Sequence, residues 1–385
     1  MRIAFISTMK GFAWGGSEVL WSKTAELALK NNHSVLISIF DWGTLHPTVQ
    51  NLQMRGASVH VRPRETKAKR LRFYQRWLKI LKQKILPKKP EHPYQHVKDF
   101  NPDIICVSQG YTFEVFYEQK ALLDLLLTHS YPYQLISLFG FEHGMLPYNS
   151  LSKAQNLFTK ATNVFFVAER NLQSAERQLA LQLRNSQVIS VPSSTSAYSI
   201  VEYPRISTVT FACAARLDCN FKGQDILLQI LASDTWKQRN WILNIYGTGP
   251  DEGYLKDLCR LYNIEDKVKF RGFESDVRKI WEENQILLMP SHGEGTPIVL
   301  VEAMLCGRTV LATDVGGNSE VIINNYTGFL ADVASVNSFG RTLEEAWQQK
   351  DKWMEMGIAA HTEAKKKIDP FPEEKLLNYL TATIR

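Results

Sequence analysis

Short apolar runs recur along the chain and alternate with segments of helical spacing. The first run is RIAFIS, at residues 2–7. A glycine-bearing loop follows, then a segment with helical spacing at 18–32, and then the second apolar run at 34–40. A strand, loop, helix and strand in this order predict a parallel α/β unit.

The same alternation continues and then begins again after about residue 207. In the first half we expect further strands at 58–63, 103–110, 135–144, 163–169 and 187–193, with a helix at 114–129. In the second half we expect strands at 208–218, 241–250, 267–273, 286–291, 308–314 and 328–332, and helices at 225–234, 252–263, 277–284, 297–307 and 335–350. Two doubly wound α/β halves predict a cleft between the carboxyl ends of their strands, where ligands bind in such folds.

The length of 385 residues favours more than one domain. We predict a first Rossmann-like domain at 1–203, a second at 204–367, and a terminal helix within 368–385 that crosses back to the first domain. The apolar run at the amino terminus is too short for a signal peptide, and no apolar run is long enough to span a bilayer. Five scattered cysteines favour neither a disulfide framework nor a zinc site, so we expect a cytoplasmic protein.

The positive charge is concentrated in one segment. The chain carries a net charge of +6, but residues 62–89 hold twelve Lys or Arg and one Glu, so the rest of the chain is net negative. This distribution argues against a nucleic-acid partner. Within 70–90, apolar residues recur at helical spacing with basic residues off that face, which is typical of helices that bind anionic membranes. A surface helix that packs on its own domain would explain the same pattern.

The loop SHGEGTPIVLVE places two carboxylates eight positions apart. Thr296 is a good N-cap and Pro297 suits the first helical position, so we predict that a helix begins here with its N–H groups directed at the cleft. Such a helix end suits a phosphate. Glu294 precedes the helix, and Glu302 is the one charged residue within the otherwise apolar helix. The two could therefore hold sugar hydroxyls at opposite ends of a ligand. An ordinary turn with a solvated glutamate remains the alternative.

The stretch from residue 291 to 322 resembles the donor-binding segment of retaining GT-B glycosyltransferases of family 4. It contains the two glutamates separated by seven residues, the EAM helix text and the loop Asp314-Val-Gly-Gly-Asn-Ser-Glu320. The resemblance covers nearly the whole chain and implies the GT-B fold, in which two Rossmann-like domains face each other across a cleft. It gives Glu320 no definite role.

Other motifs fall in the order that this resemblance implies. Arg216 and Lys222 match the pair that clamps the donor diphosphate, although two solvated loop cations would explain them as well. Gly15 and Gly16 match a Gly-Gly pair near the donor phosphate and the acceptor, and the Rossmann G-x-G-x-x-G pattern is absent. His143, at a strand end, matches a histidine near the transferred sugar.

The resemblance therefore implies two sets of site residues. The expected catalytic residues are Glu294, His143, Arg216 and Lys222. The expected donor-binding residues are Gly15, Gly16, Arg216, Lys222, Gly247, Arg271, Glu294, Gly295, Thr296, Pro297, Ile298 and Glu302. Gly247 and Arg271 belong to loops that receive the base and ribose in that family.

The expected activity is transfer of a sugar from a nucleoside-diphosphate donor to a hydroxyl acceptor, with retention at the anomeric carbon. No residue stands out as a covalent nucleophile for a double displacement, and the resemblance implies substitution on one face of the sugar instead. No cofactor is expected, and the absence of a DxD motif predicts no metal requirement. A nucleotide-sugar epimerase of related fold and a non-catalytic peripheral membrane protein are the alternatives. The text VPSSTSAY at 191–198 departs from many relatives, so the acceptor is left open, as is the choice among UDP, GDP and ADP.

Overall fold

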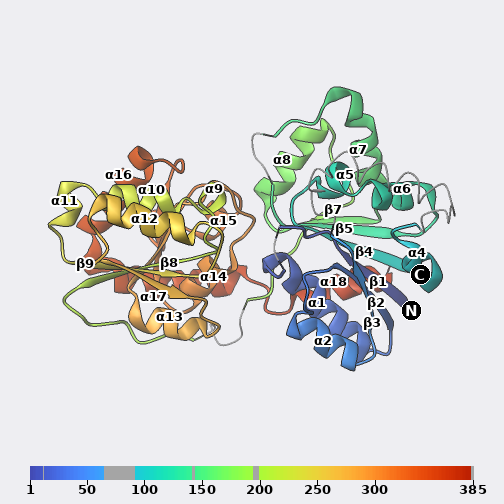
Figure 1. Cartoon of the computed structure of the whole chain (residues 1–385), viewed down its shortest axis with the longest axis horizontal. Coiled ribbons are helices and arrows are strands. Elements are labelled where there is room, and N and C mark those ends of the chain that lie inside the picture. Colours follow the sequence, from blue (N-terminus) through green and yellow to red (C-terminus); the bar gives the residue numbers. More distant parts are fainter. Residues whose placement is uncertain (12, 65–91, 141–143, 194–198, 383–385) are drawn as a thin grey trace, which may run out of the picture.

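Two parallel sheets, one in each half of the chain, organise the structure (Figure 1). This computed structural model describes residues 1–11, 13–64, 92–140, 144–193 and 199–382. The expected basic helix at 70–90 and His143 lie outside the described residues, so both remain predictions.

The first sheet has the order β3-β2-β1-β4-β5-β6-β7 over the described residues, and every pairing in it is parallel. Its strands are β1 (Arg2–Ser7), β2 (Ser34–Phe40), β3 (Ser58–Arg62), β4 (Ile104–Gln109), β5 (Tyr133–Ser137), β6 (Asn163–Phe166) and β7 (Ser186–Val188). Its helices are α1 (Gly16–Lys30), α2 (Pro47–Met54), α4 (Gln95–Phe100), α5 (Glu114–Glu118), α6 (Lys120–Thr128), α7 (Tyr148–Lys160) and α8 (Glu169–Leu179).

The second sheet is also parallel, with the order β10-β9-β8-β11-β12-β13. Its strands are β8 (Val209–Ala214), β9 (Trp241–Tyr246), β10 (Val268–Gly272), β11 (Ile286–Met289), β12 (Thr309–Thr313) and β13 (Gly328–Ala331). Its helices are α9 (Cys219–Lys222), α10 (Gln224–Leu231), α11 (Asp234–Lys237), α12 (Glu252–Tyr262), α13 (Val277–Glu283), α14 (Ile298–Leu305), α15 (Asn318–Val321), α16 (Val336–Gln348) and α17 (Trp353–Lys367), with a 3-10 turn η2 (Lys350–Lys352) before α17.

Both faces of each sheet are buried, which explains why the strands read as continuous apolar runs. In β1, Ile3 and Phe5 pack into the core beneath α1, whereas Ala4 and Ile6 pack into the core on the opposite face. Successive side chains of a strand point to opposite faces, so a central parallel strand needs an apolar residue at nearly every position. The predicted fold of two doubly wound α/β halves is confirmed.

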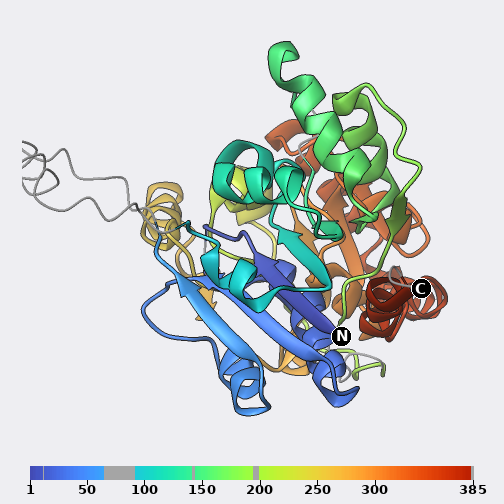
Figure 2. The same ribbon diagram turned by 90° about the vertical axis from the view of Figure 1, so that its right-hand side faces the viewer.

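The last helix, α18 (Pro372–Ala382), lies against the first domain although it follows the second in sequence. Figure 2 shows this red helix beside the blue amino-terminal elements. Its Leu376 and Leu380 share a core with Leu20 and Trp21 of α1, and Gln134 Nε2 donates a hydrogen bond to the Tyr379 carbonyl at 3.0 Å. These contacts return the chain to the domain in which it began.

One predicted helix is divided. The sequence predicts a single helix over 114–129, but the backbone leaves the helical region at Gln119, between α5 and α6. The Gln119 amide oxygen accepts a hydrogen bond from the buried Tyr94 hydroxyl at 3.1 Å. Helical periodicity alone does not reveal this break.

Candidate functional site

The carboxyl ends of strands from both sheets meet where the domains touch. A side chain placed at Gly11, after β1, would come within 3.9 Å of Arg216 Nη1, and one at Gly16 within 3.4 Å of Ile298 Cδ1. The backbone after β5 lies against the loop after β11, because a Cβ at Gly295 would fall 2.0 Å from the Leu138 carbonyl oxygen. Most of the predicted site residues lie along this contact.

Lys222 and Glu294 form an ion pair, with 2.6 Å between Lys222 Nζ and Glu294 Oε1. Glu294 is almost fully buried, with 6% of its surface exposed, and the Lys222 side chain is about one quarter exposed. Lys222 is the last residue of α9, and Gly223 follows it with φ of +62°. A Cβ at Gly223 would lie 2.1 Å from the Pro290 carbonyl oxygen, so only glycine fits there. The ammonium group has three N–H donors, so it can hold Glu294 and a second anion together.

Arg216 lies on the same connection between β8 and α10 as Lys222. Its Nη2 atom is 3.4 Å from Asp218 Oδ2, so the two side chains form an ion pair within this loop. Gly247 has φ of +118°, and a Cβ there would fall 2.1 Å from the Ala215 carbonyl oxygen. Gly247 therefore lets the end of β9 press against the backbone that carries Arg216, which gives this glycine a positioning role.

The helix after β11 begins one residue later than the capping pattern predicts. Pro297 is the N-cap residue of α14, which has no side-chain cap, and its first residue is Ile298. The prediction of Thr296 as N-cap is wrong, because the Thr296 hydroxyl instead donates to the Val167 carbonyl of the first domain at 2.8 Å. The N–H groups of the first helical turn have no partners within the helix and carry the positive end of its dipole.

Glu302 and Arg271 lie in different surroundings. Glu302 is half-buried in α14, one turn beyond its start. Arg271 Nε donates to Asn244 Oδ1 at 2.8 Å, and its Nη2 lies 3.5 Å from Glu283 Oε2. These contacts connect Arg271 to β9 and α13, and its assignment to donor binding remains a prediction.

Sequence reasoning missed a set of contacts that joins the two domains. The Glu320 carboxylate accepts hydrogen bonds from the backbone N–H groups of Glu169 and Arg170, at 3.1 and 2.9 Å, and so caps α8 from the other domain. Arg170 Nη1 also lies 2.7 Å from Asp314 Oδ1. Glu320 and Asp314 both belong to the D-x-G-G-x-x-E loop, so this loop connects the two domains. The sequence showed the loop but did not show that it contacts α8.

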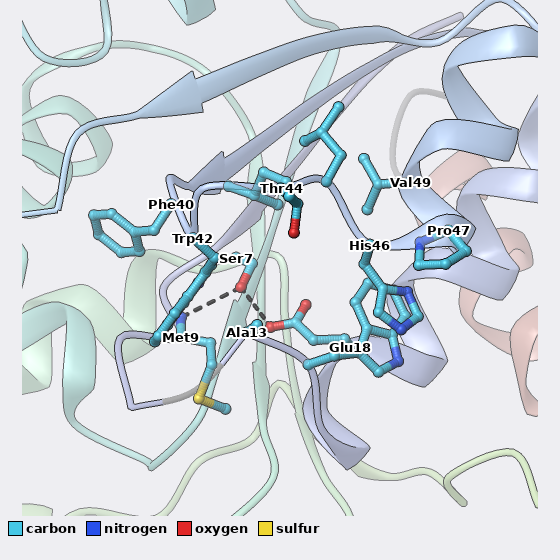
Figure 3. Close-up of a pocket in the computed structure, with 13 residues that line it drawn as sticks. Ser7, Met9, Ala13, Glu18, Phe40, Trp42, Thr44, His46, Pro47 and Val49 are labelled. Carbon is cyan, nitrogen blue, oxygen red and sulfur yellow. Dashed lines mark hydrogen bonds between the residues drawn. The ribbon is translucent and has the colours of Figure 1, made fainter. Parts of the chain in front are cut away.

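A cavity of about 160 Å³ lies in the first domain, between the loops that follow β1 and β2 (Figure 3). Its floor carries Glu18, which is 3% exposed and accepts hydrogen bonds from Ser7 Oγ at 2.7 Å and from the Trp21 indole N–H. Burial raises the pKa of Glu18 to about 7, although both hydrogen bonds and the charge of Arg62 act in the opposite direction. The aromatic walls come from Phe40, Trp42, His46 and Trp14.

No three His, Cys, Asp or Glu residues are grouped as metal ligands in the part of the chain that the structure describes. Over the same residues, no helix has the length and apolar character needed to cross a bilayer.

Comparison with known proteins finds one family match and several relatives that each align with part of the chain. Residues 172–363 match the family described as glycosyl transferases group 1. An uncharacterized glycosyltransferase of Haemophilus influenzae is 30% identical over 138 residues, which are 36% of this chain and 39% of the relative. The D-inositol 3-phosphate glycosyltransferase of Gordonia bronchialis is 35% identical over 112 residues, which are 29% of this chain and 24% of that enzyme. The alignments thus span less than half the length of these curated relatives.

Comparison of structures covers the whole chain. HepE of Anabaena, solved in complex with UDP and with UDP-glucose, superposes with a TM-score of 0.71 at 19% and 18% sequence identity. The superposition with the UDP complex covers 99% of this chain and 100% of HepE, and the one with the UDP-glucose complex covers 100% of both. At this identity the likeness shows the fold. Residues 172–363 of this chain therefore match the glycosyl transferases group 1 family, and the chain as a whole has the GT-B fold of its structural neighbours.

Proposed function

We propose that this protein transfers a sugar from a nucleoside-diphosphate donor to a hydroxyl group of an acceptor, with retention at the anomeric carbon, as a member of glycosyltransferase family 4. The observation that carries the proposal is the partly buried Lys222–Glu294 ion pair close in sequence to the start of α14, which has no side-chain cap. The family match and the UDP and UDP-glucose complexes of HepE support a sugar nucleotide as the donor, with UDP as the first nucleotide to test.

The proposed chemistry follows from the charges that develop. The bond between the anomeric carbon and the diphosphate oxygen breaks, so positive charge builds on the sugar ring and negative charge on the leaving group. Arg216, Lys222 and the N–H groups at the start of α14 stabilise the diphosphate, and such preorganised groups commonly make a large contribution to catalysis. The acceptor oxygen bonds to the anomeric carbon from the same face, and its proton passes to the leaving phosphate.

The two glutamates have separate roles in this proposal. Glu294, fixed by Lys222, accepts hydrogen bonds from the hydroxyls of the transferred sugar, while Glu302 holds the ribose. Lys222 keeps its bond to Glu294 and donates a second one to the diphosphate, so donor binding does not have to break a buried ion pair. His143 remains a candidate for a second contact to the sugar. No metal takes part, and the segment 70–90 brings the enzyme to an anionic membrane surface.

Incubation with UDP-sugars tests the proposal. We expect the enzyme to release UDP from one of them. NMR of the product should show the same anomeric configuration, axial or equatorial, as in the donor. An inverted linkage would refute retention, and an isomerised sugar nucleotide without release of UDP would identify an epimerase. Full activity in excess EDTA is expected, and loss of activity that Mg²⁺ or Mn²⁺ restores would contradict the proposed metal independence.

A further inference from the structure

The cavity above Glu18 has a composition that none of the donor-site residues explains. It is lined by Met9, Ala13 and Trp14 from the loop after β1, and by Trp42, Thr44 and His46 from the loop after β2. In Figure 3 the Thr44 hydroxyl and the Glu18 carboxylate both point into the space between these loops. At about 160 Å³ it is smaller than the roughly 300–1,000 Å³ typical of pockets for drug-sized ligands, so it suits a single small ring.

The walls of the cavity present flat aromatic faces. The rings of Trp14 and His46 are stacked, with centroids 3.8 Å apart and an angle of 4° between their planes. His46 Nδ1 accepts a hydrogen bond from the Thr48 N–H at 3.3 Å, and burial lowers the pKa of His46. The ring is therefore neutral near pH 7 and carries its proton on Nε2, which makes that nitrogen a donor.

The floor of the cavity presents an acceptor of hydrogen bonds. A carboxylate offers about four lone-pair sites, and the two described donors to Glu18, from Ser7 and Trp21, take one on each oxygen. A ligand hydroxyl that donates to Glu18 would compensate a carboxylate that burial alone makes costly. A purely apolar ligand would instead cover the Glu18 carboxylate without donating a hydrogen bond to it.

The charges around the cavity disfavour a cationic ligand. Arg64 already lies 3.9 Å above the Trp42 ring centroid, and Lys10 Nζ lies 5.7 Å from the Phe40 ring centroid. The Arg62 guanidinium also donates to the Ser7 carbonyl beneath the floor. Lys10 is paired with Glu118, so an ammonium group entering between these rings would meet the charges of Arg62 and Arg64 in addition to the Glu18 carboxylate, whereas a neutral polyol meets no such repulsion.

The position of the cavity connects it to the donor site. The loop that supplies Met9, Ala13 and Trp14 also contains Gly11, which faces Arg216, and it leads into Gly16, which faces Ile298. A ligand in the cavity therefore lies on the first-domain side of the place where we put the donor. This is the side from which an acceptor approaches in the proposed reaction.

We propose that this cavity binds one pyranose ring of a sugar acceptor, with a C–H face of the ring on the Trp14 and Trp42 side chains and a ring hydroxyl donating to Glu18. The inference rests on the proposed function, since it names the class of acceptor for that reaction. Glu18 and Trp14 are then determinants of acceptor specificity and take no part in donor binding.

Saturation-transfer NMR with methyl α-pyranosides of glucose, galactose, mannose and N-acetylglucosamine tests the assignment. At least one of them should bind the wild-type protein with saturation strongest on the C–H protons of one ring face. Glu18→Gln should weaken its affinity roughly ten- to hundredfold, as expected for loss of a hydrogen bond to a charged group. Trp14→Ala should weaken it also. If Trp14→Ala fails to fold, Glu18→Gln and Trp14→Phe decide the matter.

Glu114→Gln is the matched control. Glu114 is a second buried glutamate of the first domain, 3% exposed, with its pKa likewise raised by burial to about 7, and it lies outside the cavity lining. Pyranoside affinity should be unchanged in this variant, and UDP affinity by calorimetry should be unchanged in both glutamine variants. Equal pyranoside affinity in wild type, Glu18→Gln and Trp14→Ala would overturn the proposal.

The remaining outcomes are also decisive. A second outcome is a saturation-transfer signal from n-octanol or tetramethylammonium and from none of the pyranosides. If that signal were lost in Glu18→Gln, the ligand would be alkyl or cationic and the proposal would be overturned. Failure of UDP to bind the wild-type protein would count against the proposed function, and the pyranoside measurement would still report on the cavity.

Discussion

Removal of the Lys222 charge should damage both folding and activity, because Glu294 would then lose its ion-pair partner. Glu294 is 6% exposed and the pair is 2.6 Å apart. Breaking a buried ion pair from one side costs about 3–5 kcal/mol. The Lys222 side chain is about one quarter exposed, so solvent screens part of this effect. We therefore expect Lys222→Met to lower the free energy of unfolding of the second domain by about 2 kcal/mol.

The double variant Lys222→Met/Glu294→Gln separates stability from catalysis. With both charges gone, no uncompensated carboxylate remains, so most of the lost stability should return. Turnover should stay at least roughly a hundredfold below wild type in Lys222→Met, Glu294→Ala and the double variant, as for loss of a preorganised electrostatic group. The assays are urea unfolding followed by tryptophan fluorescence and release of UDP from the donor.

The pair Lys256–Glu252 provides the control. Its N–O distance is also 2.6 Å, but both side chains are well exposed, on α12. Lys256→Met should therefore change stability by only about 0.5 kcal/mol or less and leave turnover intact. Equal destabilisation by Lys222→Met and Lys256→Met would refute the reasoning from burial, and wild-type turnover in the Lys222→Met/Glu294→Gln double variant would remove the site assignment.

Four further outcomes are expected. Burial raises the pKa of both Glu18 and Glu114 to about 7, so the folded state holds protons that the unfolded state releases above about pH 4.5. The free energy of unfolding, measured by urea titration, should therefore fall as pH rises from about 5 to 8, and it should fall less in Glu18→Gln. Glu302→Ala should weaken UDP affinity in calorimetry about tenfold while leaving the fold intact by circular dichroism, and unchanged affinity would exclude a ribose contact. Glu320→Ala should increase the radius of gyration in X-ray scattering, because it removes both hydrogen bonds to the start of α8. An unchanged radius would show that these bonds do not hold the two domains together. Anionic vesicles should sediment with the full chain and lose that binding when the basic residues within 70–90 are replaced by glutamine, and equal sedimentation of the two would exclude this segment as the membrane contact.

The fold was largely predictable because its signals are local. The cores of the runs at 2–7 and 34–40, at 3–6 and 35–37, are apolar at successive positions, as expected of strands that are buried on both faces. The helix at 114–129 was mispredicted as one helix, because the backbone leaves the helical region at Gln119. Periodicity reports on which face of an element is buried and does not locate such a break.

The site was predictable only as far as its motifs reach. Glu294 and Lys222 were both predicted as site residues from their motifs, but their mutual ion pair required the packing of the loop after β8 against the loop after β11. Thr296 shows the limit of capping rules, since its hydroxyl is used across the domain interface. The Glu18 cavity was missed because its walls come from two loops some thirty residues apart, and neither Trp14 nor His46 has a local pattern that signals a ligand.

The central claim is that a donor diphosphate binds where Arg216, Lys222 and the start of α14 meet. A crystal structure of the protein with UDP tests it most directly. We expect phosphate oxygens within hydrogen-bond distance of Arg216, of Lys222 and of the backbone N–H groups at the start of α14, with the ribose at Glu302. Diphosphate density away from this position, with Lys222 bonded only to Glu294, would contradict it.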